Sequence, residues 1–125
     1  MKSDNNRTAI RLKEKFARIV DHWQPRIVAQ VNDYHIKIAK IQGPFVWHTH
    51  EETDELFFIH RGTLRLEFRD RIVELGPGDI YVVPRGAEHR PVAYEECEIL
   101  LFEPAGTRNT GAIDSALTVD DPEWL

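Results

Sequence analysis

The residues best placed to do chemistry lie in one short polar stretch, His48 to Glu55, which reads HTHEETDE. His48 and His50 are separated by one residue, so on an extended chain both side chains project to the same face. Glu55 follows a polar turn and begins the next apolar run, which in an antiparallel hairpin lies beside the first strand. Two imidazoles and a carboxylate therefore converge, and this combination is typical of a metal site.

A further ligand is expected from another strand, because a metal site needs three or four donors around the ion. His89 follows the stretch PRGAE, in which Pro84 and Gly86 predict a tight turn that could aim the histidine inward. Three imidazoles and one carboxylate suit one divalent transition metal such as Fe, Mn, Ni, Co, Cu or Zn, whereas Ca and Mg prefer oxygen ligands. Four protein ligands leave one or two positions open on a five- or six-coordinate ion, as Lewis-acid or oxygen chemistry requires.

Short strands are predicted around this site. After Pro25 the apolar pattern changes from a helical period to a period of two, with a hairpin turn at Asn32 and Asp33. Turns rich in Gly and Pro then separate further strand candidates, which are residues 55–60, 63–69, 71–75, 79–84 and 97–103. Many short strands with a single helix predict an all-β fold, an antiparallel barrel or sandwich.

The two ends of the chain flank this β region. Residues 9–23 carry apolar side chains at three- and four-residue steps, which predicts an amphipathic helix packed on its own domain, with a membrane-surface or partner-binding helix as the alternative. Residues 105–125 lose all periodicity and predict a tail over the barrel or a neighbouring subunit, with Trp124 as a candidate anchor. We expect one domain, in which an N-terminal helix (1–24) packs on a barrel (25–104) that the tail (105–125) follows.

Composition and charge narrow the classes of function. A chain of 125 residues with 42% hydrophobic and 30% charged residues is typical of one globular domain. A net charge of -5 argues against a nucleic-acid partner, which would require clustered Lys and Arg. No apolar run is long enough to cross a membrane, and the single cysteine, Cys97, excludes an internal disulfide. We therefore expect a cytoplasmic protein with neither a nucleic-acid nor a membrane partner.

The spacing of the site residues resembles that of the cupins. The first cupin motif is matched by Gly43, His48, His50, Glu55 and Gly62, and the second by Gly78, Pro84, Gly86 and His89. Four residues instead of the usual five separate Gly43 from His48, and Ala93 replaces the Asn that often ends the second motif. The chain is thus similar to small single-domain cupins of the phosphomannose-isomerase-like group. This resemblance implies a jelly-roll barrel of about six to eight strands, usually in a homodimer.

Two functions fit such a site. An enzyme, such as a metal-dependent dioxygenase or isomerase, would act on a small organic acid or sugar at the open metal positions, and Tyr81 and Glu88 are its candidate acid or base. A non-catalytic module would instead bind or sense a small molecule through the metal. Arg85 and Arg90 flank His89 and could hold a carboxylate or phosphate of the ligand, or else be solvated or salt-bridged, and Tyr81 is a further possible ligand contact. A purely structural role ranks last, because burying these ligands without a metal is costly.

Simpler interpretations apply to the other polar and apolar candidates. The histidines expected to be ordinary surface or strand residues are His22, His35 and His60. The acids expected to be solvated turn residues are Glu51, Glu52 and Asp54. Glu52 or Asp54 could replace Glu55 if the turn has another shape. Cys97 is expected in the core, and Phe45 and Trp47 on the outside, where a second subunit would cover them.

Overall fold

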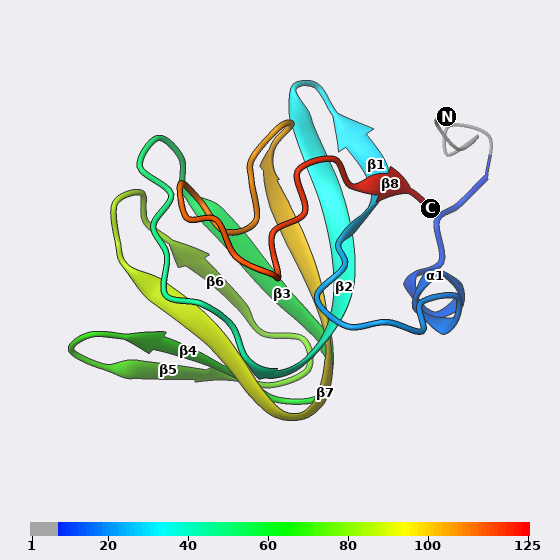
Figure 1. The fold of residues 1–125 in the computed structure, drawn as a ribbon. Coiled ribbons are helices and arrows are strands. Elements are labelled where there is room, and N and C mark those ends of the chain that lie inside the picture. Colours follow the sequence, from blue (N-terminus) through cyan, green and yellow to red (C-terminus); the bar gives the residue numbers. More distant parts are fainter. Residues whose placement is uncertain (1–7) are drawn as a thin grey trace.

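The computed structural model describes residues 8–125 and places nearly half of them in strands around a main core (Figure 1). A single helix, α1, spans Leu12–Ala17 of this described part. The strands are β1 (Arg26–Val31), β2 (Tyr34–Pro44), β3 (Glu55–Arg61), β4 (Leu64–Phe68), β5 (Ile72–Leu75), β6 (Ile80–Val83), β7 (His89–Pro104) and β8 (Glu123–Trp124). The mostly-β class predicted from the sequence is therefore confirmed.

The strands form a sheet that is not closed, so the predicted jelly-roll barrel is observed in part. Their hydrogen-bonded order is β5-β4-β7-β2-β1-β8, and β3 lies beside this path between β7 and β6. One edge of the long strand β7 pairs with β4 at residues 89–92 and with β3 at residues 98–102. The other edge of β7 pairs with β2. A jelly-roll arrangement fits this order. The sheet stays open because β5, β6 and β8 have no second partner strand among the described residues.

The hairpin at Asn32 and Asp33 is confirmed, since β1 and β2 pair in antiparallel register on either side of it. Asn32 has φ 52°, a left-handed conformation that asparagine tolerates in tight turns. The strand predicted at residues 97–103 starts eight residues earlier, because β7 begins at His89 instead of Cys97. The polar residues 94–96 that suggested a break are exposed and lie opposite a register shift between β2 and β7.

The N-terminal helix is shorter than predicted. Phe16 is 1% exposed and packs on the outer face of β1 and β2 as an amphipathic helix requires, but Val20 is 94% exposed. The chain leaves the helix after Ala17, and Trp23 adopts φ 62° so that its indole stacks on Phe45, with 4.7 Å between ring centroids. No helix in residues 8–125 has the length and apolar character to span a membrane.

The inward faces of β2, β3, β4 and β7 form the main core. Cys97 is fully buried there, as predicted, and burial raises the pKa of its thiol to about 12. The prediction for Phe45 was wrong. It is only 6% exposed, because its backbone N–H donates to the carbonyl of Pro91 and its ring turns inward under Trp23. Trp47 is half-buried under the guanidinium groups of Arg69 and Arg90.

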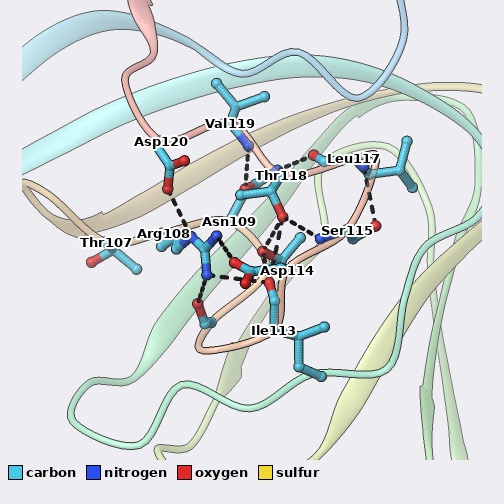
Figure 2. A network of polar contacts seen from close by, with 12 residues as sticks. Thr107, Arg108, Asn109, Ile113, Asp114, Ser115, Leu117, Thr118, Val119 and Asp120 are labelled. Carbon is cyan, nitrogen blue, oxygen red and sulfur yellow. Dashed lines mark hydrogen bonds and ion pairs between the residues drawn. The ribbon is translucent and has the colours of Figure 1, made fainter.

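The C-terminal segment crosses the sheet (orange to red in Figure 1) and ends in β8, which pairs in parallel with β1. A polar network fixes residues 107–120 (Figure 2). Arg108 donates to Asp120 at 2.7 Å and also contacts Asp114, while the hydroxyl groups of Thr110 and Thr118 lie 2.7 Å apart. Trp124 lies in β8 and contacts the ring of His35 edge-on. The first seven residues of the predicted segment 1–24 lie outside the described residues.

Candidate metal centre

The two motifs meet through paired backbone hydrogen bonds between His48 and His89. The N–H of each residue donates to the carbonyl of the other at 3.0 Å. Such a hydrogen-bonded antiparallel pair projects both side chains to one side, and the two imidazole centroids are 4.4 Å apart. The predicted turn at Pro84 and Gly86 contributes as well, because the N–H of Gly86 donates to the carbonyl of His50 at 2.9 Å.

The four predicted ligands converge on one point. His48, His50, Glu55 and His89 are 2%, 7%, 3% and 0% exposed, and each offers a ligand atom within 4.8 Å of the others. Oε1 of Glu55 lies 3.5 Å from Nε2 of His50 and 3.4 Å from Nε2 of His89. Two donors at about 2.1 Å from one ion are about 3.0 Å apart at a right angle and about 3.4 Å apart at the tetrahedral angle. These residues could therefore hold one metal ion.

The hydrogen bonds around the cluster leave its donor atoms free for an ion. Nδ1 of His48 and Nδ1 of His89 each lie 2.9 Å from a carbonyl oxygen, that of Val46 and that of Ala87, so each Nδ1–H donates and each Nε2 keeps its lone pair. Nε2 of His50, Nε2 of His89 and Oε1 of Glu55 are buried without a hydrogen-bond partner in the described residues. An unpaired buried polar atom costs about 1–3 kcal/mol, which a bound metal would offset.

The electrostatics favour the protonation states that bind metal. Burial, and next the neighbouring His89, lower the pKa of His48 to about 4. Burial alone would raise the pKa of Glu55, but contacts with His50, His89 and Glu103 outweigh it and hold that pKa well below its ordinary value. At neutral pH the cluster therefore contains a neutral His48 and an ionised Glu55, the forms that coordinate a metal.

An apolar cavity of about 40 Å³ adjoins Glu55. Its remaining lining comes from the strand interior, the segment before β1 and the tail: Trp23, Pro25, Ala39, Ile41, Phe45, Phe57, Pro91, Ile99, Leu101 and Asn109. The side-chain amide of Asn109 is already engaged, since it donates to Leu117 and accepts from the N–H of Val119. Glu55 is thus the charged residue in this lining, and its carboxylate joins the cavity to the four-residue cluster.

A second, open hollow of about 520 Å³ lies between the His50 loop and the tail. Thr49, Glu51, Glu52 and Arg108 are among its lining residues, together with His50 itself. The tail touches this loop at Gly111, where an added Cβ would lie 2.2 Å from the carbonyl oxygen of Thr49. The C-terminal segment therefore forms one wall of the approach to His50.

One buried charged pair beside the cluster was missed in the sequence. Nζ of Lys37 donates to Oε2 of Glu103 at 2.9 Å, and the register that pairs Leu56 with Phe102 sets Glu55 beside Glu103. Burial, and then the neighbouring Glu55, raise the pKa of Glu103 well above its ordinary value, against the opposing effect of Lys37. The available signal was the period of two, which puts Lys37 on the same inward face as Ala39 and Ile41.

The other candidate residues have partners outside the four-residue cluster. The backbone N–H of Arg85 donates to Asp54, the guanidinium of Arg90 donates to Glu67, Arg71 donates to Tyr81, and Arg69 donates to Glu88. Glu51, Glu52 and Asp54 are exposed, as predicted. Among the remaining histidines, His22 pairs with Glu96, His60 pairs with Glu98, and His35 contacts Trp124. None of these residues belongs to the group of four that could hold a metal in residues 8–125.

Several known proteins are similar to this chain in sequence and fold. A family model described as a cupin domain matches residues 35–103. A cupin-2 domain containing protein from Shewanella frigidimarina is 45% identical, with a TM-score of 0.78, over 80% of this chain and 98% of that one. Protein NMB1881 from Neisseria meningitidis is 30% identical, with a TM-score of 0.72, over 78% of this chain and 100% of that one. The uncharacterized protein YdbB of Bacillus subtilis is 34% identical over 54% of this chain, which spans 60% of its length.

The same fold occurs in a more distant protein that holds a metal. The hydroquinone 1,2-dioxygenase PnpCD, in complex with Cd²⁺ and 4-hydroxybenzonitrile, is 16% identical with a TM-score of 0.63 over 78% of this chain and 72% of that one. At this identity the likeness shows the fold alone.

Proposed function

Because the chain belongs to the cupin domain family, we propose that His48, His50, Glu55 and His89 bind one divalent transition metal and that the metal binds a small molecule. The observation that carries this proposal is the set of buried, unpaired donor atoms, spaced as ligands of one ion. The donor set suits Fe, Mn, Ni, Co, Cu or Zn. When bound, such an ion supplies Lewis-acid or oxygen chemistry at its open positions.

The cavity supports an organic acid over a sugar as the ligand. Trp23, Phe45 and Phe57 wall the space beside Glu55, and the amide of Asn109 in the same lining is already hydrogen-bonded to the tail. Sugar hydroxyl groups placed there would lose their hydrogen bonds to water without replacement. A small molecule with an apolar body and one oxygen-bearing head, which reaches the metal, matches both parts of the site.

A specific observation favours the non-catalytic alternative, in which the protein binds or senses its ligand. Tyr81 and Glu88, the acid or base candidates, are each engaged by an arginine, Arg71 and Arg69, away from the cluster. Ligand contacts of Arg85, Arg90 and Tyr81 stay a prediction, and each would require an exchange of the present partner for the ligand. A cytoplasmic location and membership of the phosphomannose-isomerase-like group also stay predictions from the sequence.

The proposal includes a homodimer formed through the outer face of β6. Ile80 and Val82 are 61% and 47% exposed on this strand, which pairs with β3 alone among the described strands. Their cross-strand neighbours Phe58 and Leu56 are half-buried, so the apolar strip continues onto β3. An exposed apolar face beside an unpaired edge is a typical site of association, and a second copy supplies the same face.

Elemental analysis tests the metal proposal. The protein is purified without chelator or affinity metal, alongside His50→Ala and His89→Ala, and His22→Ala serves as the control because His22 pairs with Glu96 outside the cluster. We expect about one equivalent of a transition metal in the wild type and in His22→Ala, and less than about a tenth of that in the two ligand variants. A metal-free wild type with ligand variants of equal stability would refute the proposal.

A further inference from the structure

The ion pair of Lys37 and Glu103 lies in the protein interior, and a contribution to stability does not explain it. Nζ of Lys37 and Oε2 of Glu103 are 2.9 Å apart, and the side chains are 3% and 1% exposed. Burying two charges costs several kcal/mol per ion, and replacing a buried pair by apolar residues of similar volume is often neutral or stabilising. The position of the pair in the fold therefore needs another reason.

That position is beside the proposed metal ligand Glu55. Glu103 stands next to Glu55 in the register of β3 and β7, although like charges at such neighbouring positions destabilise a sheet. Both carboxyl groups are buried at these neighbouring positions. Nζ of Lys37 donates a hydrogen bond to Oε2 of Glu103, whereas Oε1 of Glu103 is buried and has no hydrogen-bond partner in residues 8–125. Glu103 is thus held on one side by Lys37 and meets Glu55 on the other.

We propose that Lys37 and Glu103 are positioning residues of the metal centre, an inference that rests on the proposed function. Glu103, fixed by Lys37, restricts the carboxylate of Glu55, whose terminal torsion is otherwise broad. Glu103 also separates the site from the ammonium group of Lys37, which would repel a divalent cation in a medium of low dielectric constant. Neither residue is a metal ligand in this proposal. They act through Glu55.

The same lysine connects the metal centre to the C-terminal segment. Nζ of Lys37 also donates to the carbonyl oxygen of Thr107 at 3.1 Å. Thr107 is the first residue of the network that fixes the tail (Figure 2), and it lines the hollow next to His50. Lys37 therefore holds both the carboxyl group behind Glu55 and the start of the segment that walls the approach to His50.

Titration of metal-free protein with Co²⁺ tests the proposal, with the dissociation constant and the visible absorption spectrum as readouts. Glu103→Gln keeps the shape of the side chain and replaces its carboxyl group by an amide. Glu98→Gln is the matched control, because Glu98 is also a buried glutamate of β7 but pairs with His60 on the opposite face of the strand. We expect Glu103→Gln to weaken Co²⁺ binding about 10- to 100-fold and to shift the absorption bands, and Glu98→Gln to change the dissociation constant by less than about twofold.

A second variant covers the case in which Glu103→Gln does not fold. The double substitution Lys37→Met/Glu103→Leu replaces the pair by apolar side chains and should fold, yet it should also bind Co²⁺ more weakly and with altered bands. Wild-type affinity and spectrum in either folded variant would overturn the proposal while leaving the metal centre itself intact. A wild type that binds no Co²⁺ would instead overturn the proposed function, and this inference with it.

Discussion

Replacing Gly111 by alanine should destabilise the protein through one contact beside the proposed metal centre. The new Cβ would lie 2.2 Å from the carbonyl oxygen of Thr49, and ordinary contact begins at 3.4 Å, so tail and loop must separate by about 1.2 Å. Gly111 also has φ 62°, which costs an alanine about 1 kcal/mol. Overpacking of this kind adds about 1–3 kcal/mol. We expect a total loss of about 2–4 kcal/mol in the free energy of unfolding.

Gly106→Ala separates the two contributions. Gly106 lies in the same segment with φ 86°, but an added Cβ meets nothing within 4 Å, so only the conformational cost of about 1 kcal/mol applies. In a protein of 125 residues, 1 kcal/mol corresponds to about 4 °C in Tm. Calorimetry should therefore show a decrease of about 4 °C for Gly106→Ala and about 8–16 °C for Gly111→Ala. Equal decreases would refute the reasoning from the close approach to Thr49.

The metal affinity of the same two variants gives a second comparison. Thr49 lies between His48 and His50, so a displaced carbonyl at Thr49 moves two donor atoms together. Gly111→Ala should weaken Co²⁺ binding about tenfold or more, and Gly106→Ala should leave it within about twofold. Unchanged affinity in a destabilised Gly111→Ala would show that the tail supports the fold without positioning the ligands.

Three further predictions concern other parts of the molecule. The pKa of His48 falls from 6.5 to about 4 on folding, so the metal-free protein should lose up to about 3 kcal/mol of its free energy of unfolding as the pH drops from 6.5 to 4. Urea denaturation at several pH values should show this loss, and the loss should be smaller in His48→Gln. Cys97, buried and with its pKa raised to about 12, should react with a disulfide reagent only after denaturation, and rapid labelling of native protein would contradict its placement. Val82→Lys should convert the proposed dimer to monomer in light scattering, whereas Val20→Lys, at a valine 94% exposed outside the strip, should not.

The strands and the four candidate ligands follow from local spacing. Period-two patterns and Gly or Pro turns gave the strands, and the hairpin at Asn32 and Asp33 formed as expected. The helix was overestimated because its apolar spacing persists to Trp23, while the structure uses that indole to cover Phe45 instead. Sequence periodicity records which residues are apolar. It does not record which of two apolar surfaces each one meets.

The sheet edges escaped prediction for a different reason. Closure of a barrel depends on which strand pairs with the last free edge, and short strands such as β5 and β6 carry no local signal for a partner. The misplacement of Phe45 has the same origin. Alternation next to Trp47 placed it outside, but its backbone bond to Pro91 turns the chain at the point where β2 ends. Both errors arise from contacts between residues distant in sequence.

Lys37 and Glu103 show most clearly what spacing cannot reveal about the site. They are 66 residues apart, and only the combined registers of β2 with β7 and of β3 with β7 bring both of them to Glu55. Neither Lys37 nor Glu103 alone carries a signal in the sequence for a place beside the cluster. Two carboxyl groups side by side in the interior require a compensating positive charge, and the fold offers Lys37 on one side and the proposed metal on the other. Metal binding and the Lys37–Glu103 ion pair would therefore depend on each other. Removing the metal should weaken the ion pair, just as removing the ion pair should weaken metal binding.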